Sequence, residues 1–508
     1  MNTKDRFALA KNAFANVARG GAAALVSVLL PPFLARLMTA DAYGAWSLVL
    51  QLSAFVGYLD FGIQTAIGRF VAHAGESGDT EHRDRIVSTS MAALTVAGVA
   101  GVLGYMGLAV LMPHVFHEVS GLLLVDARKA FLLVGVSLAL GLPFSVFNGI
   151  FVGLQRYEVP AAIIGGSRII SAFFLVLIVR QGGNLTQMAA AVASVNLASY
   201  GLQYMLYRAI APRVQFSSSF VSRSAGHELF DYCLSLSVWS FATLLVSGLD
   251  VPLVGYFEFG KVASYSVAAT LTVFLAGLQN ALFNVMIPST AVLQARGNSI
   301  QLGQVMIAAT RYGSFVLLLM GLPLILAARS ILTVWVGPTY AAQGTRILQV
   351  LVVANIIRLS AVPYVMTLIG TGQQRLVTIT PLLEGVSNLL VSLIAGYLLG
   401  AIGVAIGTLV GGIVAVLGNF VYNMKRTVEI EFRIGDYLRD GLLRPLACAL
   451  PLTMAIVTLS LWESPVVIRG YLLIGIAVVG TALLLWRWGL VGSEREKLRS
   501  WCMLLTQS

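Results

Sequence analysis

Fourteen long apolar segments divide this chain, and they restrict its fold more than any other feature of the sequence. A helix needs about 20 mainly apolar residues to cross a bilayer. The segments have close to that length, with loose ends: 13–36, 43–67, 87–112, 130–153, 160–179, 186–207, 232–257, 263–290, 304–327, 346–369, 376–399, 401–424, 444–461 and 467–488. Hydrophobic residues make up 58% of the 508 residues and charged residues only 11%, outside the range of soluble domains. The sequence predicts an all-α, polytopic membrane protein with about 14 transmembrane helices.

The second half of the chain resembles a diverged copy of the first, at a constant offset of 219 in residue number. Several separate segments match at this repeat offset without gaps: Trp46-Ser47 with Tyr265-Ser266, Phe55 with Phe274, Leu59 with Leu278, Val115-Phe116 with Val334-Trp335, and Gly153-Leu154-Gln155-Arg156 with Gly372-Gln373-Gln374-Arg375. Large transporters are commonly built from such repeats, with the substrate path between the two copies. We therefore expect pseudo-symmetric six-helix lobes over 1–215 and 220–428, two additional helices over 440–490, and a tail over 491–508.

The distribution of basic residues predicts the orientation of the chain in the membrane. With the N-terminus in the cytoplasm, 21 Lys and Arg residues fall on the cytoplasmic side and eight on the other. This bias indicates an even number of spans with both termini in the cytoplasm. It also accounts for the net charge of +11, so we expect no nucleic-acid partner.

The connecting segments are too short to hold a soluble domain. The longest are expected near 69–86, 113–129, 208–228 and 425–443. Three cysteines are too few and too scattered for a disulfide framework or a metal site, so we predict neither a metal nor another cofactor. Whatever the protein does, it does within the membrane.

Arginines inside the apolar segments are the main candidates for substrate binding. A charge at bilayer depth costs at least about 2.5 kcal/mol unless it faces water, a partner or a substrate. Arg358 lies near the middle of the tenth segment and Arg168 well inside the fifth. Arg19 and Arg311 lie about two turns from cytoplasmic segment ends, where long side chains also reach the interface. Guanidinium groups bind phosphate oxygens bidentately, so these four arginines predict an anionic substrate, such as a lipid-linked diphosphate sugar.

Three acids also lie inside apolar segments: Asp60, Asp250 and Glu384. They are candidates for three roles. They can form salt bridges with the arginines, relay protons or sodium ions, or accept hydrogen bonds from sugar hydroxyls. The sequence leaves these roles open.

Short motifs along the chain resemble the polysaccharide transporters, or lipid-linked oligosaccharide flippases, of the multidrug, oligosaccharidyl-lipid and polysaccharide exporter superfamily. The resemblance runs from about residue 10 to about residue 425. Its motifs keep the family's order and spacing: Leu37-Met38-Thr39-Ala40-Asp41-Ala42-Tyr43-Gly44, Leu59-Asp60-Phe61-Gly62-Ile63, Gly153-Leu154-Gln155-Arg156-Tyr157, Trp335-Val336-Gly337-Pro338-Thr339-Tyr340, Asn388, and Gly400-Ala401-Ile402-Gly403-Val404-Ala405.

The resemblance implies alternating access by two six-helix lobes around a central cavity. It also implies passage of an isoprenoid-diphosphate-linked saccharide, of the kind used for O-antigen, lipopolysaccharide or exopolysaccharide, from the inner to the outer leaflet of a bacterial inner membrane. Arg19 is the residue that the family's pattern suggests for the diphosphate, whereas Arg168 and Arg358 rest on the residue-level argument. A polysaccharide polymerase or a chain-length regulator is the partner that the family suggests, besides the lipid-linked substrate and membrane lipid.

Two other functions compete with this interpretation. A cation-coupled multidrug exporter of the same superfamily would favour an acidic or aromatic cavity for cationic drugs, which the excess of arginine argues against. A membrane glycosyltransferase or polymerase would need a sizeable outer loop with catalytic carboxylates. The outer segment 113–129 is short and carries no paired-acid motif, so we expect no enzymatic activity.

Overall fold

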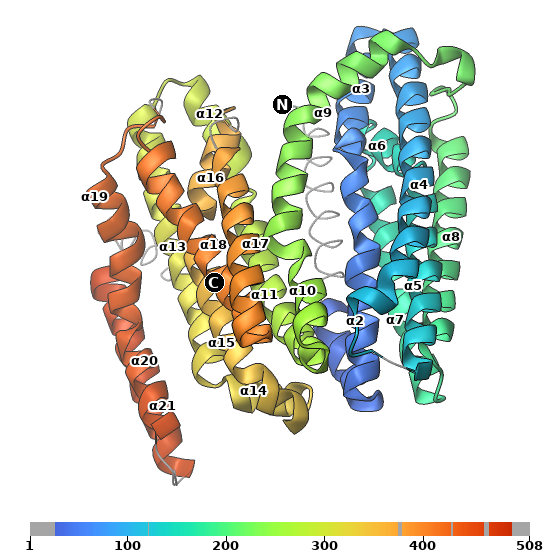
Figure 1. Cartoon of the computed structure of the whole chain (residues 1–508). Coiled ribbons are helices and arrows are strands. Elements are labelled where there is room, and N and C mark those ends of the chain that lie inside the picture. Colours follow the sequence, from blue (N-terminus) through green and yellow to red (C-terminus); the bar gives the residue numbers. More distant parts are fainter. Residues whose placement is uncertain (1–25, 120, 374–377, 428–429, 462–466, 490–508) are drawn as a thin grey trace, which may run out of the picture. The chain divides into compact units, whose positions relative to one another are not determined.

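The computed structural model describes residues 26–119, 121–373, 378–427, 430–461 and 467–489. Every regular element within these ranges is a helix (Figure 1). The principal helices of the first sequence copy are α2 (Ala40–Ser53), the 3-10 helix η1 (Ala54–Asp60), α3 (Ile63–Ser77), α4 (Thr80–Val115), α5 (Gly121–Gly141), α6 (Ser145–Gly153), α7 (Glu158–Arg180) and α8 (Leu185–Ile210). A shorter apolar helix, Val26–Leu37, precedes them.

The second copy and the C-terminal region continue in the same style. Their principal helices are α9 (Arg223–Thr243), the π-helix η3 (Leu244–Gly248), α10 (Asp250–Phe257), the 3-10 helix η4 (Phe259–Lys261), α11 (Val262–Phe283), α12 (Met286–Ala295), α13 (Ser299–Leu326), α14 (Ala328–Trp335), α15 (Pro338–Leu359), α16 (Val362–Gly370), α17 (Ile379–Leu399), α18 (Ala401–Gly418), the π-helix η6 (Asn419–Asn423), α19 (Ile434–Asp436), the π-helix η7 (Tyr437–Leu443), α20 (Arg444–Leu461), α21 (Val467–Leu484) and the π-helix η8 (Leu485–Gly489).

The polytopic all-α class predicted from the sequence is confirmed, and the count of spans is smaller in the part that the structure describes. Ten helical spans there are long and apolar enough to cross a membrane, or eleven if α5 and α6, bent by 40°, form one span. Pro143 lies in the break between those two helices, where a proline interrupts helical hydrogen bonding. The first of the fourteen predicted segments, 13–36, lies mostly outside the described residues.

The predicted long connection at 69–86 is wrong, because helix occupies nearly all of it. Helix α3 runs to Ser77 and α4 begins at Thr80, so the turn between them is two residues long. Helix α4 has 36 residues and is therefore about 54 Å long, well beyond the thickness of a hydrocarbon core. The polar residues of the segment therefore lie in helices and not in a loop.

The turns before α4 and α13 share the same local chemistry at equivalent positions of the two copies. Gly78 and Gly297, which correspond at the repeat offset, have positive φ angles of 75° and 66°. Each is followed by an N-cap residue, Asp79 or Asn298, whose side chain accepts a hydrogen bond from a backbone N–H in the first helical turn. Such caps satisfy donors that the helix leaves unpaired. These details agree with a duplicated chain, which stays a prediction.

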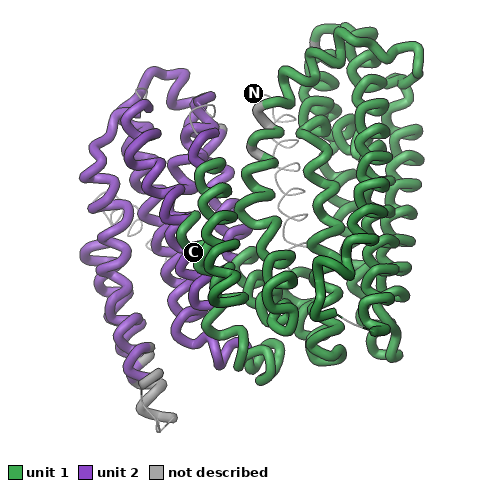
Figure 2. The backbone as a smooth tube through the Cα atoms, in the orientation of Figure 1, with its two compact units in different colours: residues 1–274, 333–347, 381–411 green, residues 275–332, 348–380, 412–508 purple. Residues whose placement is uncertain are grey.

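The chain forms two compact units (Figure 2). The first comprises 1–274, 333–347 and 381–411, and the second comprises 275–332, 348–380 and 412–508. The first unit holds the described helices of the first sequence copy together with several from the second copy: α9, η3, α10, η4, most of α11, α17 and α18, and part of α15. The units therefore do not follow the boundary near residues 215–220. The division into lobes over 1–215, 220–428 and 440–490 remains a prediction from the repeat.

Glycines allow α17 and α18 to pack in close contact within the first unit. A Cβ atom at Gly403 would lie 1.9 Å from the carbonyl oxygen of Ala395, and one at Gly407 would lie 2.0 Å from the Ser392 hydroxyl oxygen. Their spacing of four residues places them on one face of α18. This close approach positions the polar side chains of α17 directly beside those of α18.

Candidate functional site

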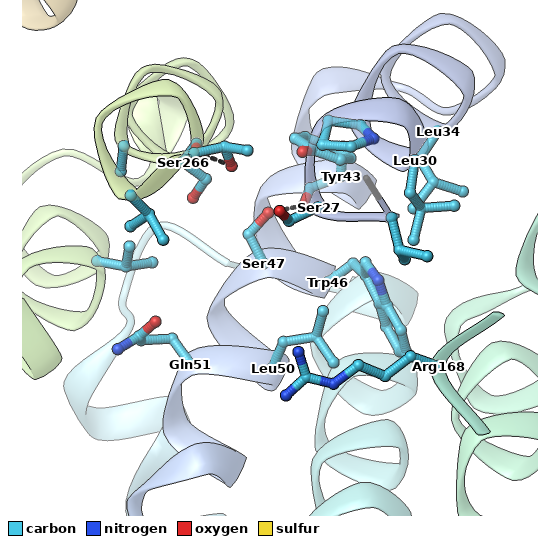
Figure 3. A pocket seen from close by; sticks show the side chains of 16 residues that line it. Ser27, Leu30, Leu34, Tyr43, Trp46, Ser47, Leu50, Gln51, Arg168 and Ser266 are labelled. Carbon is cyan, nitrogen blue, oxygen red and sulfur yellow. Dashed lines mark hydrogen bonds between the residues drawn. The ribbon is translucent and has the colours of Figure 1, made fainter. Parts of the chain in front are cut away.

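A cavity of about 380 Å³ lies within the first compact unit (Figure 3). Its wall comes from helix Val26–Leu37, α2 and α7 of the first sequence copy and from α10 and α11 of the second. The lining residues are Val26, Ser27, Leu30, Pro31, Leu34, Tyr43, Trp46, Ser47, Leu50, Gln51, Arg168, Val251, Ser266, Ala269, Thr270 and Val273. The cavity therefore lies where helices of the two copies meet.

Three pairs of residues in the wall are equivalent under the repeat offset. Helix α2 contributes the first member of each pair and α11 contributes the second: Ser47 with Ser266, Leu50 with Ala269, and Gln51 with Thr270. Their spacing of i, i+3 and i+4 is that of one helical face. Equivalent faces of α2 and α11 thus line one cavity.

Arg168 is the single cationic side chain among the described residues that line the cavity. Its side chain is exposed, and Figure 3 shows its guanidinium group among the lining side chains. Within the described part of the chain, no hydrogen bond or ion pair is made by this group. Acidic side chains are absent from the described lining. The guanidinium group is thus available to an anionic ligand.

Two polar atoms in the cavity wall lack protein partners among the described residues. The Trp46 indole Nε1 makes no hydrogen bond, although only 1% of this residue is exposed. The Ser266 hydroxyl is also buried and unpaired. Buried polar groups normally have hydrogen-bond partners, and each one left without a partner costs about 1–3 kcal/mol. Both atoms belong to side chains of the cavity wall.

The other predicted arginines do not line this cavity. Arg358, on α15, is half-buried and donates a hydrogen bond to Asn355 Oδ1 at 3.0 Å. Arg311, on α13, is buried, and its guanidinium carbon lies 5.4 Å from the ring centre of Tyr312. Both belong to the second compact unit. Arg19 lies outside the described residues.

Asp60 has a local structural role. Its carboxylate accepts hydrogen bonds from the Ser145 hydroxyl at 3.3 Å and from the backbone N–H of Gln64 at 3.5 Å. The second bond satisfies a backbone donor in the first turn of α3, where a carboxylate also interacts favourably with the helix dipole. Glu384 is a buried residue of α17, with 8% of its surface exposed.

Asp250 lies in a group of buried oxygen atoms at the start of α10. The Thr408 hydroxyl donates to its carboxylate at 3.2 Å and also lies 3.4 Å from the Val404 carbonyl oxygen. The Ser392 hydroxyl lies 3.3 Å from the same carbonyl oxygen and 3.0 Å from Asn388 Oδ1. The Asp250 carboxylate is therefore linked through the Thr408 hydroxyl to the Val404 carbonyl, and this carbonyl is linked through the Ser392 hydroxyl to Asn388.

The π-helix η3 explains why this polar group forms there. A π-helix displaces the ordinary helical hydrogen bonds and leaves carbonyl groups in need of donors. Asn388 Nδ2 donates to the Val246 carbonyl at 2.6 Å and lies 3.5 Å from the Leu245 carbonyl. The Asn388 side-chain amide on α17 thus stabilises the π-helical break between α9 and α10 and orients the beginning of α10.

The sequence prediction included Arg168 and Asp250 but missed their surroundings. Ser47, Gln51, Ser266 and Thr270 are ordinary polar residues in apolar segments, and none carries a charge that draws attention. The signal that could have found them is their equivalence at the repeat offset. Among the described residues, no group of three or more His, Cys, Asp or Glu is placed to hold a metal ion.

Comparisons with known proteins agree on the fold. The family model described as "Polysaccharide biosynthesis protein" matches residues 9–294. EpsK of Bacillus subtilis (strain 168), described as an uncharacterized membrane protein, is 23% identical over 430 residues, covering 84% of each chain. The solved lipid II flippase MurJ, in an inward closed conformation, is similar with a TM-score of 0.72 and 13% identity, covering 93% of this chain and 97% of MurJ.

A multidrug resistance MATE family transporter of the MOP superfamily, in an inward-facing conformation, is also similar. Its TM-score is 0.56 at 18% identity, and the match covers 82% of this chain and 94% of that transporter. At these identities the two structural likenesses show the fold alone. The fold is that of MOP-superfamily transporters.

Proposed function

Because this chain belongs to the polysaccharide biosynthesis protein family, we propose that it is a flippase for an isoprenoid-diphosphate-linked saccharide. It carries the head group from the cytoplasmic to the outer leaflet of a bacterial inner membrane by alternating access, with both termini in the cytoplasm. No covalent bond forms or breaks. Arg168 in the cavity between helices of the two copies is the observation that supports this proposal most directly.

Electrostatics favours an anionic head group in this cavity. A guanidinium group within the membrane is costly unless a counter-charge or water compensates it, and Arg168 has no carboxylate partner in the described structure. A phosphate group accepts two parallel N–H bonds from one guanidinium group. The diphosphate is therefore held at Arg168, while the isoprenoid tail stays in the bilayer.

The rival functions find less support in the same cavity. A cationic drug would lie beside the positive charge of Arg168 without an acidic side chain among the described lining residues to offset it. A glycosyltransferase or polymerase would need a general base or an acid at the reacting group, and the described lining supplies neither a carboxylate nor a histidine.

Alternating access requires contacts between the two copies that can open. The predicted topology places one end of the first unit in the cytoplasm. At that end, His82 Nε2 lies 3.4 Å from Glu228 Oε2, and the Arg69 guanidinium carbon lies 4.9 Å from the ring centre of Tyr232. These contacts join α3 and α4 to α9. An exposed ion pair contributes only about 0–1 kcal/mol and an exposed cation–π contact about 0.5–1 kcal/mol, so a gate made from them can open.

The acids supply a candidate for coupling to an ion gradient. Asp250 offers one negative charge, and the Thr408 hydroxyl oxygen beside it offers a neutral ligand. We place the coupling proton or monovalent cation there, and we assign Asp60 to the structure of α3. Arg358, Arg311 and Arg19 stay candidates for substrate binding, and Glu384 stays a candidate coupling or salt-bridge acid.

Cells that lack the protein test the proposed function. Their lipids should accumulate an isoprenoid-diphosphate saccharide, which mass spectrometry would detect, and the wild-type gene should remove it. Arg168→Ala should fail to do so at equal protein level, whereas Arg180→Ala, on the same helix but outside the cavity wall, should succeed. Absence of any accumulated lipid-linked saccharide would reject the flippase and return attention to the drug exporter.

A further inference from the structure

The equivalent faces of α2 and α11 give the cavity a paired set of neutral polar groups. Ser47 and Gln51 on α2 correspond to Ser266 and Thr270 on α11, and all four line the cavity. Arg168 and Trp46 are outside this pairing, because their equivalents at the repeat offset, Ser387 and Tyr265, are not among the lining residues. The wall therefore combines a paired set of neutral polar groups with one charge.

The paired groups offer hydrogen-bond acceptors. The Ser47 hydroxyl donates its proton to the Tyr43 carbonyl at 2.9 Å, and the Thr270 hydroxyl donates to the Ser266 carbonyl at 2.9 Å. With its single proton used, each oxygen keeps lone pairs for a ligand. Gln51 Nε2 donates to the Gly248 carbonyl at 3.0 Å, which fixes the amide and leaves its carbonyl oxygen as an acceptor.

Donors are present in the same wall. The Trp46 indole nitrogen can only donate, and it has no acceptor among the described residues. The unpaired Ser266 hydroxyl can donate and accept. Figure 3 shows Trp46, Ser47 and Ser266 together in the view of the cavity. A ligand that fits must therefore accept from some groups and donate to others at close spacing.

A sugar meets this requirement, because every hydroxyl both donates and accepts a hydrogen bond. A phosphate at neutral pH mainly accepts, so it matches Arg168 but not the acceptor oxygens of Ser47, Gln51 and Thr270. An apolar drug would leave all of these groups without partners, at a cost for each. The chemistry of the wall thus separates an anion-binding part from a hydroxyl-binding part.

We infer that Ser47, Gln51, Ser266 and Thr270, with the Trp46 N–H, form a saccharide subsite that reads the first sugar next to the diphosphate. This inference rests on the proposed function and adds to it the part of the head group that these residues contact. Arg168 supplies affinity for every diphosphate lipid, whereas the α2 and α11 faces distinguish a lipid that carries a sugar from one that does not.

Binding to the purified full-length protein in lipid nanodiscs tests the subsite. Two probes are compared by native mass spectrometry: undecaprenyl diphosphate, and the same lipid carrying one N-acetylglucosamine. The variants are Ser266→Ala, Thr270→Val and Trp46→Phe, each of which removes one polar group. Thr272→Val is the matched control, because its hydroxyl donates to its own helix as Thr270 does but does not line the cavity.

Each subsite variant should weaken binding of the sugar-bearing lipid by about 3- to 10-fold and leave binding of undecaprenyl diphosphate within about 2-fold. The control should change neither. The subsite would be overturned if the variants lost affinity for both lipids equally, or for neither. The proposed function would still stand in either case, as long as the wild-type protein bound the two lipids. If the wild-type protein bound neither lipid, the proposed function would fall, and the subsite with it.

Discussion

Replacing Arg168 by alanine should abolish most of the affinity for a diphosphate lipid without unfolding the protein. The structure separates the two effects, because Arg168 makes no hydrogen bond or ion pair with any other described residue and its side chain is exposed. Removal of the side chain therefore leaves no buried partner unsatisfied. We expect a change in folding free energy within about 0.5 kcal/mol, as for other surface positions.

The loss of affinity follows from the bonds that the guanidinium group can make. A hydrogen bond to a charged group contributes about 1.5–3 kcal/mol, which corresponds to about 10- to 150-fold in the dissociation constant. Arg168→Lys keeps the charge but loses the bidentate geometry, so its affinity should lie between wild type and Arg168→Ala. Binding of undecaprenyl diphosphate in nanodiscs measures both variants.

A matched control separates this specific contact from the general basic charge of the protein. Arg180 lies on the same helix and is exposed, but it does not line the cavity. Arg180→Ala should bind as tightly as wild type, and the thermal unfolding midpoints of all three variants should agree with the wild-type value. Our reasoning would be refuted by wild-type affinity in Arg168→Ala, or by an equal loss in Arg180→Ala.

Three further predictions concern the polar group around Asp250 and the contact between α17 and α18. Asn388→Ala should lower the free energy of unfolding by about 1–3 kcal/mol, and the thermal unfolding midpoint with it, because the Val246 carbonyl loses its donor. The comparison is Ser387→Ala, because the Ser387 hydroxyl bonds only to its own helix among the described residues. Gly407→Ala should strongly reduce the amount of folded protein on a detergent gel-filtration column, because the new Cβ would lie 2.0 Å from the Ser392 hydroxyl; Gly201→Ala, with nothing within 4 Å of its Cβ, should not. Asp250→Asn should bind the diphosphate lipid normally in nanodiscs, but transport of this lipid in vesicles should no longer respond to an imposed proton or sodium gradient. An unchanged response would show that Asp250 has no role in coupling.

The apolar segments predicted the helices well because a helix in lipid must satisfy its own backbone hydrogen bonds. This requirement is local, so it can be read from each segment in turn. The ends of the segments were predicted less well. Helix α3 continues to Ser77 and α4 begins at Thr80, where the sequence predicted a long connection. Polar residues there favoured a loop on hydropathy alone, although most of them lie in helices.

The breaks in the helices were not predicted from the apolar segments. The sequence predicts one segment over 130–153, whereas the structure bends between α5 and α6 at Pro143, where proline removes a helical hydrogen bond. The π-helix at Leu244–Gly248 has no comparable local signal, because its carbonyl groups are satisfied by Asn388, which is distant in the sequence. A break that depends on a distant donor cannot be recognised from its own segment.

The sequence by itself determined that this chain is a bundle of membrane helices, that its halves share a pattern at one constant offset, and that a few arginines lie among apolar residues. Those properties depend on composition and on spacing along the chain. Only the tertiary structure decided that Arg168 shares a cavity with Trp46 and Ser266. Whether a polar side chain of a membrane helix meets a cavity or another helix depends on how each helix is rotated and packed, and that is set by contacts between residues far apart in the chain.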